Sequence, residues 1–299
     1  MLEKYFDYKK HKTDFKTEVI AGVTTFLTMA YIMFLNPFIL SGEFAGPEKG
    51  FFDFGAVFTA TIVATALACF IMAFYGKTWP IGLAPGMGLN AFFTFTVVIE
   101  MGYSWEVALG AVFLAGILFV LMSVTPLRRW MLDSIPMNLR VAMGSGVGLF
   151  VGFIGLKSGG LIIANDSNFL SLGDFSKTET VLAGLGFLLI SVLSIRKVPG
   201  AIIVGVMVVT IAAMLFGLVQ FQGLVSMPPD LAPTFMKLDI LGALDLTMVS
   251  VVISFLFVNL FDTAGTLLGV ANRAKLMDEN GDVKNLDRAL KADSTSSVV

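Results

Sequence analysis

A succession of eight long apolar segments restricts the fold of this chain more than any other feature. Most are roughly 17–25 residues long, the length that an α-helix needs to cross the hydrocarbon core of a bilayer. Hydrophobic residues make up 56% of the 299 positions and charged residues only 14%, well below the share in soluble domains. We therefore predict an all-α polytopic membrane protein. The segments are Val19–Leu40, Phe54–Tyr75, Ile81–Ile99, Val107–Thr125, Val141–Leu156, Thr180–Ile195, Val198–Val219 and Leu246–Asn272.

The loops between these segments are short and rich in Pro, Gly and charge, so none resembles a linker between soluble domains. We divide the chain into a cytoplasmic N-terminal tail (1–18), an eight-span transmembrane region (19–272), and a cytoplasmic loop with the start of a ninth span (273–299). The final ADSTSSVV begins a segment and does not complete it. We therefore expect the chain to be the N-terminal part of a longer protein.

Lys and Arg are distributed unevenly between the two sets of loops. With the N-terminus in the cytoplasm, 16 of the 20 basic residues fall on the inner side, and only Lys49, Lys157, Lys177 and Lys237 fall outside. Cytoplasmic loops carry the excess of basic residues in membrane proteins. This count supports eight spans and a cytoplasmic N-terminus, and we expect a multi-pass protein of the cytoplasmic (inner) membrane.

The chain has few of the side chains that metal binding and nucleophilic catalysis require. Its single cysteine, Cys69, lies inside an apolar run, and its single histidine, His11, lies in the Lys-rich tail. A His/Cys metal site and a Ser-His-Asp or Cys-His arrangement are therefore excluded. The net charge of −2 gives no basic surface for nucleic acid. We expect neither a cofactor nor an enzyme.

The third segment contains an irregular stretch. Pro80, Gly82, Pro85, Gly86 and Gly88 fall close together in WPIGLAPGMGLNAFF, so Ile81–Gly88 is unlikely to be regular helix. Non-helical backbone at membrane depth is tolerated only where protein or a water-filled cavity covers it. We predict an extended stretch followed by a half-helix from about Leu89, an arrangement that forms the substrate site in many secondary transporters.

Asp262 is the only carboxylate inside any of the eight apolar segments. A charge at the bilayer centre costs roughly 2.5–3.5 kcal/mol on insertion scales, so such residues usually face a partner, a cavity or a ligand. No Lys or Arg lies inside a segment to pair with it. A carboxylate in this position can couple proton movement to ligand binding, which makes Asp262 a candidate for both roles.

Other polar residues accompany Asp262. Asn259 and Thr266 share its helix face, and Thr263 is adjacent, although a hydrogen-bonded clamp between helices is the alternative for these three. Asn90 lies where the third segment becomes helical, so it could contact a ligand, cap the half-helix, or do both. A weaker stripe in the first segment includes Thr28, for which packing and local hydrogen bonds are the alternative.

Two motifs, GLAPGMGLNAFFTF and FVNLFDTAGTLLGVANRA, resemble the nucleobase/ascorbate transporter superfamily, and within it the AzgA-like purine permeases. The opening FKTEVIAGVTTFLTMAYIMFLNP and the final ALKADSTSSVV extend the resemblance over nearly the whole chain. The resemblance implies an inverted-repeat transporter of two seven-span halves with broken third and tenth spans, truncated here in the second repeat. It implies proton-coupled uptake of adenine, guanine or hypoxanthine across the cytoplasmic membrane. The permease could act as a monomer or as a homodimer.

By position, the resemblance assigns Asp262 to the acidic residue that contacts the base or its proton, and Asn90 with Ala91 to the start of the third half-helix. Asn259 stands where some relatives carry a second acid. Three other classes stay open. A sulfate-type anion carrier should have a cationic residue near the break, and this sequence has none there. A membrane-embedded hydrolase is disfavoured because the spans of this chain contain no His or Lys. A non-transporting membrane protein fits a shortened chain.

Overall fold

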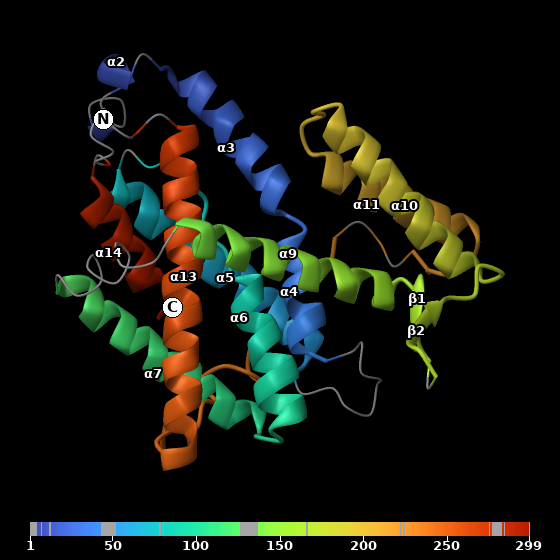
Figure 1. Cartoon of the computed structure of the whole chain (residues 1–299). Helices are drawn as coiled ribbons and strands as arrows, with labels where there is room; N and C mark the ends of the chain where they lie inside the picture. Colours follow the sequence, from blue (N-terminus) through green and yellow to red (C-terminus); the bar gives the residue numbers. More distant parts are fainter. Residues whose placement is uncertain are drawn as a thin grey trace. The chain divides into compact units, whose positions relative to one another are not determined.

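The computed structural model describes residues 5–6, 8–11, 13–42, 52–77, 79, 81–125, 137–165, 167–221, 223, 225–274, 276, 283 and 285–298. These residues form two compact units. Figure 1 shows their helices and strands coloured along the sequence. Unit 1 comprises Met1–Asp7, Ile32–Val147 and Pro228–Val299, and unit 2 comprises Tyr8–Tyr31 and Gly148–Met227. One helix, α9 (Met137–Ser158), runs through the boundary between them.

Unit 1 is helical, and its longest helix is α13 (Val249–Arg273), drawn in orange in Figure 1. The α13 helix packs against α7 (Trp105–Val124), α6 (Met87–Ala91) and α14 (Leu286–Ser296). The remaining elements of the unit are α4 (Ile32–Leu40), α5 (Phe54–Ile71), the π-helices η3 (Met72–Gly76) and η4 (Phe92–Glu100), α12 (Ile240–Ala243) and the 3₁₀-helix η5 (Leu246–Met248).

Side chains of this sequence fix where several of these helices begin. Asp53 accepts a hydrogen bond from the Ala56 backbone N–H at 2.7 Å, at the start of α5. Asp239 caps α12 in the same way by accepting from Gly242 at 2.9 Å. Such caps satisfy backbone N–H groups that have no partner inside the helix, and each contributes about 1 kcal/mol.

Two apolar clusters hold the helices of unit 1 together. The first joins the end of α5, α7, α13 and α14 through buried residues that include Met72, Phe119 and Leu260. The second joins η4, α7, α12 and α13 through Phe93, Met248 and Phe255, among others. The Phe255 ring also meets Phe92 edge to face, with centroids 5.0 Å apart. The α13 helix contributes to both clusters, so it is fixed along much of its length.

Unit 2 contains α2 (Tyr8–His11), α3 (Phe15–Met29), α10 (Thr178–Ile195), α11 (Ala201–Leu215) and a hairpin of β1 (Ile162–Asn165) and β2 (Phe169–Leu172). The α10 and α11 helices lie side by side (Figure 1). The strands pair antiparallel with Ile162 opposite Leu172. Large apolar side chains on α10, such as Leu185, Phe187 and Leu188, are more than half exposed. Exposed apolar faces of this kind are suited to contact with lipid.

Each of the eight predicted segments contains helix. Within the part of the chain that the structure describes, five helical stretches are long and apolar enough to cross a membrane: Phe15–Leu40, Phe54–Gly76, Trp105–Val124, Thr178–Ile195 and Leu246–Ala271. The other three segments hold shorter apolar helices, Met87–Glu100, Gly148–Ser158 and Ala201–Leu215. The expectation of a helical membrane protein is therefore confirmed, and the number of eight spans stays a prediction.

The structure adds two features that the segments did not indicate. The first segment is divided at a turn, Ala30–Tyr31, between α3 and α4, and α4 contains Pro37, which lacks the N–H that a continuous helix would use. Residues 286–296 at the end of the chain form α14, whose Ala289, Leu290 and Ala292 are buried in unit 1. This helix includes part of the segment that was expected to start a ninth span.

Candidate functional site

The third segment is broken, as its Pro and Gly content predicted. Residues 81–86 form no regular helix, and α6 begins at Met87 after Gly86, whose backbone is extended (φ −74°, ψ 116°). The expected start near Leu89 was therefore two residues late. The Asn90 N–H already reaches the Gly86 carbonyl oxygen at 3.2 Å, so Gly88 is accommodated inside the first turn. Beyond α6 the segment continues as the π-helix η4. π-Helices are rare in proteins, and those that occur often lie at functional sites.

Asn90 does not cap this helix, and that alternative is wrong. It lies inside α6, and its side-chain amide donates to Oδ1 of Asn36 in α4. Asn36 in turn donates to the Thr61 hydroxyl of α5 at 2.7 Å, and Thr61 donates to the Val57 carbonyl at 2.7 Å. Asn36 and Thr61 are buried. This polar chain ties the start of the half-helix to two neighbouring helices.

Asn36 and Thr61 were absent from the predicted site. A signal for Asn36 existed, because it is an amide placed directly before Pro37 inside the apolar run of the first segment. The sequence did not indicate that Thr61 has a partner on another helix, since a threonine can satisfy its hydroxyl within its own helix. Only the packing of α4 against both α5 and α6 shows that the three polar side chains meet.

The Asp262 carboxylate lies against the break. A Cβ added to Gly86 would fall 2.7 Å from Oδ2 of Asp262, so the carboxylate occupies the space that a side chain there would need. The Asp262 side chain nevertheless keeps an exposed surface. Asp262, Gly86 and the start of the half-helix therefore meet at an accessible point between α13 and α6.

The α13 helix is continuous through Asp262, so Asn259, Asp262 and Thr266 share one face as predicted. Asn259 is partly buried and Thr266 is exposed. Next to Gly265 and Gly269 no described atom comes within 4 Å of an added Cβ. The described part of the chain thus leaves open space beside this face of α13, as a ligand would require.

Thr263 faces a different neighbour. Its hydroxyl donates to Oδ2 of Asp293 in α14 at 2.8 Å, and Thr263 is only 6% exposed. Asp293 is thus a second carboxylate beside α13, hydrogen-bonded to the residue that directly follows Asp262. Asp293 was absent from the predicted site, because the sequence does not show that residues 286–296 pack beside α13.

The other predicted residues lie as follows. Ala91, on the first turn of the half-helix, is buried at 3% exposure. Thr28 belongs to α3 in unit 2, where its hydroxyl donates to the Thr25 carbonyl oxygen at 2.7 Å. Thr28 thus makes a local hydrogen bond within its own helix, which was the alternative to a ligand contact for this residue. Among the described residues, no group of three or more His, Cys, Asp and Glu side chains could hold a metal ion.

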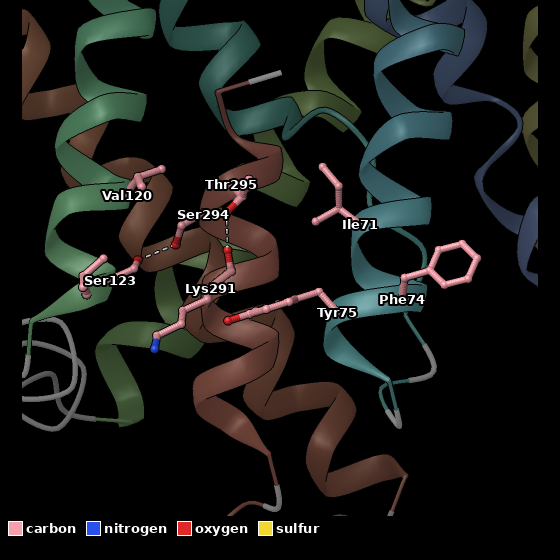
Figure 2. A pocket seen from close by; sticks show the side chains of 9 residues that line it. Ile71, Phe74, Tyr75, Val120, Ser123, Lys291, Ser294 and Thr295 are labelled. Atoms are coloured by element: carbon pink, nitrogen blue, oxygen red, sulfur yellow. Dashed lines mark hydrogen bonds between the residues drawn. The ribbon is translucent and has the colours of Figure 1, made fainter. Parts of the chain in front are cut away.

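A pocket of about 460 Å³ lies elsewhere in unit 1, between the end of α5, η3, α7 and α14 (Figure 2). It is lined by Ile71, Phe74, Tyr75, Val120, Ser123, Val124, Lys291, Ser294 and Thr295. None of the predicted site residues lines it. Because its wall is mostly apolar and it lacks the carboxylate and amide groups described above, we place the candidate site at Asp262 and Gly86.

The helices and this site define a multi-pass membrane protein in which the carboxylate of one long helix meets a break in another. The chain belongs to the permease family, whose sequence pattern matches residues 16–299. Permeases are transporters and not enzymes, in agreement with the expectation from the sequence.

Several curated proteins resemble the chain over nearly all of its length. The adenine permease AdeP of Escherichia coli is 42% identical over 298 residues, which cover 100% of this chain and 65% of AdeP. The guanine/hypoxanthine permease PbuG of Bacillus subtilis is 41% identical over 303 residues, covering 100% of the chain and 68% of PbuG. The nucleobase transporter PlAzg2 of Paenibacillus larvae is 32% identical over 259 residues, covering 85% and 50%.

These matches confirm the resemblance to purine permeases of the AzgA type. The chain spans about two thirds of the length of AdeP and PbuG.

Proposed function

We propose that the protein containing this chain takes up purine nucleobases, namely adenine, guanine or hypoxanthine, together with protons across the cytoplasmic membrane. The observation that carries the proposal is the position of the Asp262 carboxylate against Gly86, at the break of the third segment. The names of the relatives, adenine permease and guanine/hypoxanthine permease, support the choice of cargo.

The chemistry of a purine base suits this site. A base offers ring N–H donors, ring nitrogen acceptors and a flat apolar face. The Asp262 carboxylate accepts hydrogen bonds from N–H groups when ionised and donates one when protonated. Asn90 and Asn259 can donate and accept, while Thr266 offers a hydroxyl. Ala91 is buried, so in this proposal it supports the half-helix by packing behind the site.

Asp262 is also the proposed proton-coupling group. An exposed side chain between two helices can exchange a proton with water, and a base bound beside it changes the stability of its charged form. Binding of base and proton then becomes reciprocal, because each changes the affinity for the other by the same factor.

We further propose that the N-terminus is cytoplasmic and that the eight apolar segments all cross the membrane, since 16 of 20 basic residues then face the cytoplasm. The proposed architecture is the inverted repeat of the family, in which a later broken span completes the site. A homodimer is compatible with this arrangement.

Uptake of labelled bases tests the coupling. The protein containing this chain is expressed in cells that lack their own purine permeases, and initial rates are measured for adenine, guanine and hypoxanthine. The rate should rise as external pH falls and collapse when an uncoupler removes the proton gradient. Uptake that is indifferent to both would refute proton coupling, and absence of uptake for all three bases would refute the cargo.

A further inference from the structure

The hydrogen bond between Thr263 and Asp293 connects the candidate site to a helix that the sequence had not associated with it. The Thr263 hydroxyl donates to Asp293 Oδ2 at 2.8 Å across 30 residues of sequence. Since Thr263 is nearly completely buried, water competes poorly for its hydroxyl.

Thr263 directly follows Asp262 on α13, so the two side chains point about 100° apart around the helix axis. Asp262 meets Gly86 of the broken segment on one side, and Thr263 meets α14 on the other. A rotation of α13 that broke the Thr263–Asp293 bond would also move the Asp262 carboxylate away from Gly86. The bond therefore fixes the orientation in which Asp262 is presented.

The α14 helix is firmly held and can serve as the support. Its Ala289, Leu290 and Ala292 are buried in the cluster that also contains Leu260 and Leu267 of α13. On the side facing α7, the hydroxyl of Ser294 makes a hydrogen bond with Ser123, drawn as a dashed line in Figure 2. Asp293 is thus placed by the packing of its helix on two neighbours.

We propose that Asp293 is a positioning residue of the purine site, which acts through the Thr263 hydroxyl to hold Asp262 against the broken third segment. The effect on transport rests on the proposed function, whereas the position of Asp262 against Gly86 can be tested without transport. Supporting groups of this kind usually decide whether a site keeps its productive geometry.

Transport kinetics give the first test. Thr263→Val has nearly the same shape and removes the donor, and Asp293→Ala removes the acceptor. Each should raise the KM for the transported base about tenfold at unchanged amounts in the membrane, and the double variant should be no worse than either single one, because one bond is lost in all three. Thr263→Ser, which restores a hydroxyl, should return KM toward the unchanged protein.

Thr295→Val is the matched control. Thr295 lies two residues from Asp293 on α14, but its hydroxyl donates to the Lys291 carbonyl of its own helix at 2.8 Å. Its KM should stay unchanged. If Thr263→Val leaves KM unchanged, or if the effects of Thr263→Val and Asp293→Ala add fully in the double variant, the positioning role is wrong.

A cross-link separates this inference from the proposed function. A Cβ at Gly86 would lie 3.9 Å from Asp262 Cγ, so Gly86→Cys with Asp262→Cys, in a Cys69→Ala background, should form a disulfide under mild oxidation. Thr263→Val or Asp293→Ala should slow its formation several-fold, and Thr295→Val should not. This result requires no transport. Equal rates in all variants would overturn the inference even if purine uptake were demonstrated.

Discussion

At the scale of single residues, the candidate site consists of a few polar side chains whose partners lie on other helices. Asn90 is joined to Asn36 and Thr61, and Asp262 is flanked by the Thr263–Asp293 bond. A buried polar group that loses its partner costs roughly 1–3 kcal/mol, so each of these contacts constrains both stability and geometry.

Asn36→Leu should therefore lower the stability of the protein. The change leaves the partly buried Asn90 amide without its acceptor and removes the amide that donates to the buried Thr61, so we expect a loss of about 2 kcal/mol. Thermal unfolding of the detergent-solubilised protein measures it. Asn168→Leu is the matched control, because Asn168 is exposed in the β1–β2 hairpin. Equal midpoints for the two variants would contradict the buried polar chain.

Acid should loosen the start of α3 through Asp14. Hydrogen bonds from the Thr17 hydroxyl and backbone N–H lower the pKa of the Asp14 carboxyl below its usual value. The stabilising contribution is therefore present above the pKa of the unfolded chain, near 3.9, and is lost as pH falls through the lower folded pKa. The protection of the Thr17 amide, relative to its intrinsic exchange rate at each pH, should fall below about pH 4, and should not do so in Asp14→Asn. A Thr17 amide that behaves alike in both proteins would disprove the cap.

At the scale of elements, the broken third segment and α13 form the candidate site. The Pro and Gly content of residues 80–88 sufficed to predict the break, because both residue types disfavour helix by a local mechanism. The polar stripe of Asn259, Asp262 and Thr266 could also be predicted, since helical spacing alone places the three residues on one face.

Contacts between distant elements were out of reach of the same reasoning. The Thr263–Asp293 bond depends on α14 packing beside α13, and the Asn36–Asn90 bond depends on α4 packing beside α6. The switch from α-helix to π-helix at Phe92 also escaped prediction, because it changes the hydrogen-bond register without a distinctive residue. Local rules thus supply the elements of the site, and tertiary packing supplies its partners.

Gly86→Ala should impair transport. The added Cβ would lie 2.7 Å from Asp262 Oδ2, closer than non-bonded atoms tolerate, so the carboxylate must move. We expect uptake of the transported base to fall at least tenfold while the amount of protein in the membrane is unchanged. Gly22→Ala in α3 is the matched control, because no described atom lies within 4 Å of its added Cβ. Full activity of Gly86→Ala would show that Asp262 does not work from this position.

At the scale of the whole molecule, the chain supplies one broken helix and the helix that faces it, and it spans about two thirds of the length of AdeP and PbuG. The family architecture proposed above places further contacts to the base on a second broken span. Under that proposal, these residues form one side of the binding site.

The 299 residues alone should insert into the membrane without binding purines tightly. Losing two or three polar contacts, at roughly 1–3 kcal/mol each, removes about a hundredfold or more of affinity. Scintillation proximity with labelled adenine, guanine and hypoxanthine on the purified chain measures this. Micromolar binding would mean that the groups around Asn90 and Asp262 suffice.

Replacement of Asp262 by Asn in the protein containing this chain tests the central claim most directly. The amide keeps the shape and hydrogen-bonding capacity of the side chain but cannot exchange a proton at neutral pH. Accumulation of labelled adenine, guanine or hypoxanthine against a gradient is measured at matched amounts in the membrane, with Asn168→Asp as a control at an exposed site. The account predicts that Asp262→Asn abolishes accumulation and leaves insertion intact. Retained concentrative uptake would show that Asp262 is structural and would contradict the account.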